Sequence, residues 1–192
     1  MVVQGSIPVS HRLEVGMNLY YEVVVDNQLQ IRTDVRHPMR GQSAFQTDLC
    51  LVECITAATG SGTGELAVPR VVFEFKLGMT AHDVLTYSAK ARKHKVVYPY
   101  LRYGIVVVRE RSVPRKFFVH NEALDFCVAI GAHIEDEQQL ARVFGRLIAS
   151  ELDASKILEQ AAFGKAGPDI FRSEAVLGYL DTQHAGSPLL PN

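Results

Sequence analysis

A mixed α/β domain is the fold class that this sequence predicts, with a central mixed β-sheet flanked by helices. Short apolar stretches at 70–78 and 102–110 are typical of buried strands, and a capped helical segment lies between them. A second helical segment with its own apolar stripe begins near residue 135. This order of strands, helix, strands and helix indicates one domain in which helices cover a sheet.

The composition is that of a globular protein. The 192 residues are 47% hydrophobic and 21% charged, which is enough for a core without disulfides or a metal. We expect residues 1–164 to form one domain, followed by a tail at 165–192 with at most a short helix. No apolar run approaches the ~18 residues of a membrane span, and the N-terminus lacks the basic start of a signal peptide.

Three cysteines, Cys50, Cys54 and Cys127, suit a reducing compartment better than a disulfide framework. We therefore expect a cytoplasmic protein without a membrane partner. The spacing of Cys50 and Cys54 permits a metal pair, but no second pair follows. Small buried hydrophobic side chains are the favoured interpretation.

The N-terminal segment permits two interpretations. Apolar residues alternate strictly over 13–25, which predicts a strand, and a turn would lead into a returning strand at 29–35. A helix over 10–25 is the alternative, which Gly16 weakens.

The middle of the chain carries the clearest elements. We expect a strand at 45–55, a flexible loop at 56–69 rich in Gly, Thr and Ala, and a strand at 70–78. A helix then begins at Thr80, because Thr80 and Asp83 form a capping-box pattern, and it ends near residue 94.

The C-terminal half is predicted as a strand at 102–110, a turn, a returning strand at 116–120 and a strand at 125–130. Acidic residues at 135–137 favour the start of a long helix. Its buried stripe comprises Leu140, Val143, Phe144, Leu147 and Ile148. Leu152, Ile157 and Leu158 either extend that stripe or belong to a second helix.

Charged residues interrupt the strand at 70–78. Glu74 and Lys76 lie two residues apart and so share one face, while Phe73, Phe75 and Leu77 face the other side, into a core. Taken alone, such a pair is typical of an exposed ion pair. If the strand at 45–55 pairs antiparallel with this one, however, Asp48 converges with Glu74 and Lys76 at one edge of the sheet.

Two neighbouring carboxylates form an oxygen-rich site suited to Mg²⁺. Asp48 and Glu74 would be its ligands, and the backbone carbonyl of Phe75 could add another. A lysine beside such an ion can orient the attacking water or stabilise charge on a phosphate, so Lys76 has a role in the same chemistry.

A basic block follows the strand at 70–78. Residues 90–116 hold nine bases against one acid, Glu110: Lys90, Arg92, Lys93, Lys95, Arg102, Arg109, Arg111, Arg115 and Lys116. Such a block predicts a polyanion site. The alternative is that Lys90 to Lys95 lie at a helix C-terminus, where cations are favoured by the macrodipole.

Asp48, the E-x-K pair, the capped helix and the basic block together resemble the PD-(D/E)xK nuclease superfamily, which has the restriction endonuclease-like fold. The resemblance covers residues 44–109, with Thr47-Asp48 in place of the usual Pro-Asp. It implies catalytic roles for Asp48, Glu74 and Lys76, with Asp48, Glu74 and the Phe75 carbonyl holding Mg²⁺ or Mn²⁺.

The same resemblance implies auxiliary residues. Members of the superfamily usually begin with a helix that carries another acid, for which Glu22 or Glu14 is the candidate here. Polar groups on the helix after E-x-K often reach the site, which implies Tyr87 and Lys90.

We therefore expect a Mg²⁺-dependent endonuclease that hydrolyses DNA, as a homodimer or a subunit of a larger nuclease assembly. Its phosphate-binding residues would be Lys90, Arg92, Lys93 and Lys95. One alternative is a non-catalytic nucleic-acid-binding or assembly protein on the same fold. Another is an unrelated α/β protein with a surface ion pair, in which Asp48 and Glu74 diverge.

Overall fold

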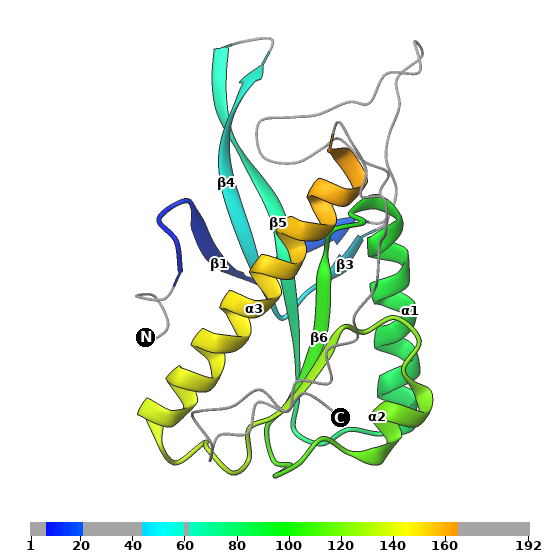
Figure 1. Cartoon of the computed structure of the whole chain (residues 1–192). Helices are drawn as coiled ribbons and strands as arrows, with labels where there is room; N and C mark the ends of the chain where they lie inside the picture. Colours follow the sequence, from blue (N-terminus) through cyan, green and yellow to red (C-terminus); the bar gives the residue numbers. More distant parts are fainter. Residues whose placement is uncertain (1–6, 21–43, 60–61, 165–192) are drawn as a thin grey trace, which may run out of the picture.

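The computed structural model describes residues 7–20, 44–59 and 62–164, which build a five-stranded mixed sheet with helices on both faces (Figure 1). The predicted mixed α/β class is thereby confirmed. The strands in spatial order are β1 (His11–Val15), β4 (Leu49–Thr59), β5 (Gly62–Lys76), β6 (Arg102–Val107) and β7 (Phe126–Ala129). β1, β4 and β5 pair antiparallel, whereas β5, β6 and β7 pair parallel.

Alternation along the strands builds a separate core on each face of the sheet. Val72 and Tyr103 pack with residues of α1 (Ala81–Val97) and α2 (Arg115–His120). Val71, Phe73 and Val106 pack on the other face against Leu147, Ile148 and Leu152 of α3 (Glu137–Phe163). Central strands buried on both faces carry near-continuous apolar runs, which explains why the sequence identified them.

The interval 56–69 is part of a long β-hairpin, so the predicted flexible loop is wrong. β4 and β5 stay paired as far as Thr59 and Gly62, and the hairpin projects beyond the rest of the sheet (Figure 1). Its Gly- and Thr-rich composition misled the prediction, because glycine has a weak strand preference of its own. The register shifts where Val52 meets Pro69, since proline has no N–H to donate to the ladder.

The predicted strand at 45–55 is two strands. β3 (Ala44–Gln46) pairs with β2 (Asn18–Tyr20) in a small second sheet. Thr47 and Asp48 belong to neither strand and separate β3 from β4. The backbone N–H and the hydroxyl of Thr47 both donate to the carbonyl oxygen of Met17, at 2.9 and 3.0 Å.

Residues 11–20 are extended, so the helical alternative is wrong over this stretch. Gly16, with φ of 68°, separates β1 from β2 in the left-handed region that favours glycine. The expected returning strand at 29–35, the candidate acid Glu22 and the tail at 165–192 all lie outside the described residues.

The expected strand at 116–120 is instead the helix α2. Because β6 and β7 are parallel, the chain between them must cross back over one face of the sheet. α2 supplies part of that crossover and buries Phe117 in the core that it shares with α1. The other strands predicted in this half, β6 and β7, are confirmed, although β6 ends at Val107.

Both long helices are confirmed. The capping box of α1 is present, with reciprocal hydrogen bonds between Thr80 and Asp83. α3 is one continuous helix in which Leu152 extends the buried stripe, whereas Ile157 is exposed. The assignment of Leu77 to the core is wrong, because β5 ends at Lys76 and the Leu77 side chain is 59% exposed.

No helix in the described stretches is long and apolar enough to cross a membrane. The three cysteines are free thiols, and Cys50 is buried as expected of a small hydrophobic side chain.

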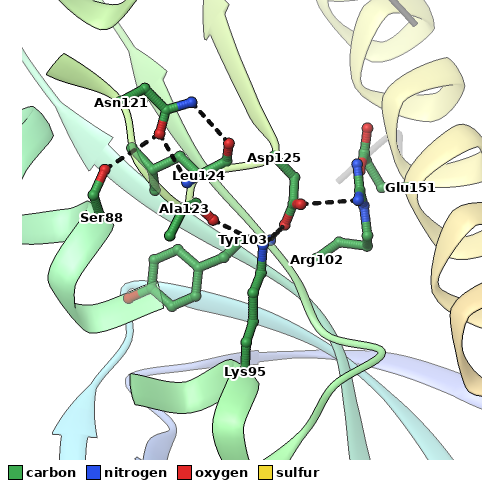
Figure 2. A network of polar contacts seen from close by, with 9 residues as sticks. All are labelled: Ser88, Lys95, Arg102, Tyr103, Asn121, Ala123, Leu124, Asp125 and Glu151. Atoms are coloured by element: carbon green, nitrogen blue, oxygen red, sulfur yellow. Dashed lines mark hydrogen bonds and ion pairs between the residues drawn. The ribbon is translucent and has the colours of Figure 1, made fainter. Parts of the chain in front are cut away.

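A polar network joins α3, α1 and the sheet where β6 begins (Figure 2). Arg102 donates to Glu151 of α3 at 2.7 Å and to Asp125 at 2.8 Å. Asp125 also accepts from the Tyr103 N–H and pairs with Lys95 of α1, each at 2.7 Å. One arginine and one aspartate therefore fix both helices relative to the strand.

Removing Glu151 tests this network. We expect Glu151→Ala to lower the free energy of unfolding by about 3 kcal/mol, because it leaves the Arg102 guanidinium mostly buried with one partner lost. Urea denaturation measures the change. Asp153→Ala, an exposed acid on the same helix, is the matched control and should change stability by less than about 0.5 kcal/mol. Equal losses in the two variants would contradict the structural role of the network.

Candidate functional site

Asp48 and Glu74 meet where β4 begins and β5 ends. The antiparallel pairing expected from the sequence is present and places Leu49 opposite Phe73. Asp48 therefore reaches the end of β5, where its Oδ2 accepts the Phe75 N–H at 2.7 Å. Glu74 points to the α1 face, where burial raises the pKa of its carboxyl and the neighbouring Asp48 carboxylate adds to that rise.

Glu74 is a buried acid, with its residue only 1% exposed. The hydroxyl of Tyr103 donates to its Oε1 at 2.5 Å, and the Lys90 ammonium lies 3.9 Å from the same oxygen. Burial is the main cause that raises the pKa of Glu74, while Tyr103 and Lys90 act in the opposite direction. This carboxyl is therefore harder to ionise than an ordinary glutamate.

Lys76 lies on the same face as Glu74, half-buried against Tyr87. Its Nζ is 4.7 Å from the centroid of the Tyr87 ring, and the Nζ of Lys90 is 4.8 Å from it. Hydrogen bonding to Tyr87 is the main cause that raises the pKa of Lys76, and the charges of Asp48 and Glu74 add to it. Lys76 is thus a cation at neutral pH, and a cation beside two acids can donate to an anionic substrate but cannot act as a base.

Aromatic rings support this polar group from β3 and α1. His94 is fully buried, stacks on the Tyr103 ring with centroids 5.7 Å apart, and donates from Nε2 to the Leu19 carbonyl at 2.8 Å. Burial lowers the pKa of His94 to about 4, so it is neutral. Phe45 packs edge-on against His94. The Nζ atoms of Lys90 and Lys93 lie over the Phe45 ring, 5.3 and 5.7 Å from its centroid. These contacts fix the orientation of Tyr103 and hence of Glu74.

The structure therefore brings together five of the residues singled out from the sequence: Asp48, Glu74, Lys76, Tyr87 and Lys90. Sequence reasoning missed Tyr103, because Tyr, Ile and Val alternate along β6 and indicated only core packing. The available signal was the face of the sheet on which the Tyr103 side chain lies. Tyr103 pairs with Val72, which faces the same side as Glu74 two residues later.

Other expected residues lie elsewhere. Lys95 forms the ion pair with Asp125 and donates to the Ala123 carbonyl, each at 2.7 Å, so its charge already has a partner within the protein. Its contact with phosphate stays a prediction. Glu14 pairs with Arg12 at 2.8 Å, and no contact in the described stretches joins it to Asp48 or Glu74. Arg92 is exposed on α1.

A hard cation such as Mg²⁺ fits the donor set at the end of β5. In the described part of the chain, each carboxylate uses one oxygen for a protein hydrogen bond, which leaves Oδ1 of Asp48 and Oε2 of Glu74 as donors. The Lys76 carbonyl faces β6, so the preceding Phe75 carbonyl faces β4 and Asp48. Two carboxylates and one carbonyl would leave the remaining positions to water, as Mg²⁺ prefers. No group of three His, Cys, Asp or Glu side chains that could hold a metal occurs among the described residues.

The sequence matches no known family model, and it matches no curated protein. Its resemblance to the PD-(D/E)xK nucleases therefore stays a prediction that rests on Asp48, Glu74 and Lys76.

The Tyr103 hydroxyl gives a first prediction for this site. In Tyr103→Phe, the ionised form of Glu74 loses its strongest donor, so the pKa of Glu74 should rise further. Carboxyl-labelled glutamate followed by NMR during a pH titration measures this directly. Tyr100→Phe, which alters a tyrosine that packs on Arg70 instead, is the control. An unchanged titration in Tyr103→Phe would show that the hydroxyl does not stabilise the carboxylate.

Glu74 also predicts a dependence of stability on pH. A pKa raised in the folded state means that this group favours folding at low pH, and that the contribution is lost as the pH rises through the folded pKa. In EDTA at pH 7.5, Glu74→Gln should therefore melt a few degrees above the wild type, and the difference should vanish in acid. Glu122→Gln, at an exposed position, is the control. A lower melting temperature for Glu74→Gln at pH 7.5 would mean that Lys90 and Tyr103 outweigh burial.

Proposed function

We propose that this protein is a Mg²⁺-dependent nuclease that hydrolyses phosphodiester bonds in DNA. The observation that carries the proposal is the juxtaposition of the Asp48 and Glu74 carboxylates with the Lys76 ammonium at one end of β5. Diverging acids would have favoured an unrelated α/β protein with a surface ion pair.

Asp48, Glu74 and the Phe75 carbonyl are the proposed ligands of Mg²⁺, for which Mn²⁺ can substitute. When bound, this ion polarises a phosphoryl oxygen and lowers the pKa of a coordinated water. Asp48 is exposed whereas Glu74 is buried, so substrate and water approach from the Asp48 side. Burial keeps Glu74 rigid as a ligand. Because the pKa of Glu74 is raised, protons compete with the metal at a higher pH than they would at a glutamate with an ordinary pKa.

Lys76 is the proposed group that acts on the substrate. Because it stays protonated, it donates hydrogen bonds to the attacking water or to a non-bridging phosphate oxygen, where charge builds in the transition state. The Tyr87 ring restricts where its ammonium can lie. Lys90 and Lys93, held over Phe45 on the same side of α1, are the proposed contacts to neighbouring phosphates.

DNA is the proposed partner, and cutting both strands of a duplex is most simply done by a homodimer or a larger assembly. Arg92 is exposed on the same helix and remains a proposed phosphate contact.

One observation favours a second candidate, a non-catalytic nucleic-acid-binding or assembly protein on the same fold. Lys90 lies 3.9 Å from Glu74, and Tyr103 donates to the same oxygen, so part of the charge at this site is compensated within the protein. A site of this kind can be stable without a metal while its lysines still bind phosphate.

Plasmid cleavage separates the two candidates. We expect the wild type to cut DNA in Mg²⁺ and not in EDTA, and Lys76→Ala to lose about 10²-fold or more in rate, as for loss of one transition-state donor. Lys156→Ala, an exposed lysine on α3, is the control and should cut normally. Asp48→Asn should in addition remove any Mn²⁺-dependent rise in melting temperature.

Cleavage that survives EDTA or the Lys76→Ala substitution would exclude the proposed mechanism. DNA binding by the wild type without cleavage of any DNA would favour the non-catalytic candidate.

A further inference from the structure

A second basic surface lies beyond the end of β6. Residues 109–119 carry four exposed bases, Arg109, Arg111, Arg115 and Lys116, against the single acid Glu110. No ion pair joins any of the four to another described residue, in contrast to Arg102 and Lys95 at the other end of β6. Clustered bases without partners repel one another, and a bound polyanion relieves that repulsion.

This surface is fixed beside the candidate site. The Val108 and Arg109 N–H groups donate to the carbonyls of Lys76 and Leu77, at 2.8 and 3.0 Å. On the other side the Gly131 N–H donates to the Glu110 carbonyl at 2.9 Å. A Cβ at Gly131 would come within 2.6 Å of that carbonyl oxygen, so only glycine permits this close approach. Residues 108–110 therefore form a rim that backbone hydrogen bonds hold in place. Within this rim, Arg109 bonds to Leu77, the residue that follows Lys76 at the end of β5.

The helix α2 holds its bases against local preference. Arg115 and Lys116 occupy its first turn, where the positive end of the helix dipole disfavours cations. Its N-cap, Pro114, offers no side-chain hydrogen bond, and the first turn contains no acid. Bases in the first turn and the lack of a side-chain cap both weaken the helix, which indicates that Arg115 and Lys116 have a role other than folding.

An exposed aromatic ring accompanies the bases. Phe117 anchors α2 in the core, and the Phe118 ring packs edge-on against it at 5.6 Å while the Phe118 residue remains 61% exposed. Val119 beside it is 63% exposed. A ring that packs against a buried side chain while most of its own surface stays exposed to solvent is suited to stacking on a nucleobase.

We propose that residues 109–119 form a nucleic-acid-binding surface. Arg109, Arg111, Arg115 and Lys116 contact the phosphates, and Phe118 stacks on a base that is not covered by pairing. The inference rests on the proposed function for the identity of the partner. Charge complementarity and continuity with the Lys76 end of β5 favour a nucleic acid over a second copy of this chain.

Fluorescence anisotropy with a labelled single-stranded oligonucleotide and its duplex tests the surface in EDTA, where binding is separated from cleavage. Arg111→Ala/Arg115→Ala should lower the affinity for both about tenfold or more at low salt, and should reduce the slope of log affinity against log salt by about 2 for duplex. Arg142→Ala/Arg146→Ala, with two exposed arginines on α3, is the matched control and should behave as the wild type.

Phe118→Ala tests the stacking role. It should lower the affinity for the single strand at least about fivefold while leaving the salt slope unchanged, because it removes no charge. Circular dichroism verifies that α2 variants remain folded.

The outcomes distinguish this inference from the proposed function. If the wild type binds and the double arginine variant binds equally well, the surface is excluded while the nuclease proposal stands. If the wild type binds no nucleic acid, both fall. If Phe118→Ala leaves binding unchanged but converts a dimer to a monomer in sedimentation, the face is an interface between two copies and the inference is overturned.

Discussion

The burial of the Glu74 carboxylate on the α1 face of the sheet is the constraint on which the rest of the site depends. An ionised carboxylate removed from water is costly unless hydrogen bonds and opposite charges surround it. Tyr103 supplies the hydrogen bond and Lys90 the nearest positive charge. His94 then matters because it is a neutral ring that supports Tyr103. Each neighbour of Glu74 thus has a physical reason to be where it is.

The topology explains how these groups meet. β5 is the strand at which the sheet changes from antiparallel to parallel pairing. Its antiparallel neighbour β4 places Asp48 beside Glu74 at the end of β5, although a long hairpin separates Asp48 from Glu74 in the sequence. Its parallel neighbour β6 brings Tyr103 to the same face, and α1, the crossover between them, supplies Tyr87 and Lys90. A wholly parallel or wholly antiparallel arrangement would not place these groups around one carboxylate with such short connections.

Patterns that depend on local geometry were predictable from the sequence. The strand at 70–78 and the capped helix after it follow from alternation and from the pairing of Thr80 with Asp83, which are short-range effects. The convergence of Asp48 with Glu74 followed from assuming that two strands close in sequence pair antiparallel.

Features that depend on distant contacts were not predictable. Gly- and Thr-rich residues at 56–69 have weak strand preference, and their pairing comes from the extension of a hairpin that begins in the core. The helix at Arg115–His120 is part of the crossover that the parallel pairing of β6 with β7 requires, and that pairing cannot be read from the local sequence. The partner of Glu74 was missed for the same reason, because the role of Tyr103 depends on which strand lies beside β5.

The basic block at 90–116 shows why a count of charges overstates a binding surface. In the sequence its nine bases are equivalent, but the fold divides them by whether an acid lies within reach. Lys95 and Arg102 are at the end of the sheet where Asp125 and Glu151 neutralise them, so they connect elements of the core.

Beyond the other end of β6, Arg109, Arg111 and Arg115 have no acidic partner among the described residues, and the rim that carries Arg109 is held rigid by backbone hydrogen bonds. Because a surface arginine with an internal partner must give up that partner to bind a phosphate, the unpaired set retains more of its interaction energy for a ligand. The electrostatic attraction to a polyanion is therefore expected to be stronger beyond the Lys76 end of the sheet than at the opposite end, where Asp125 and Glu151 neutralise Lys95 and Arg102.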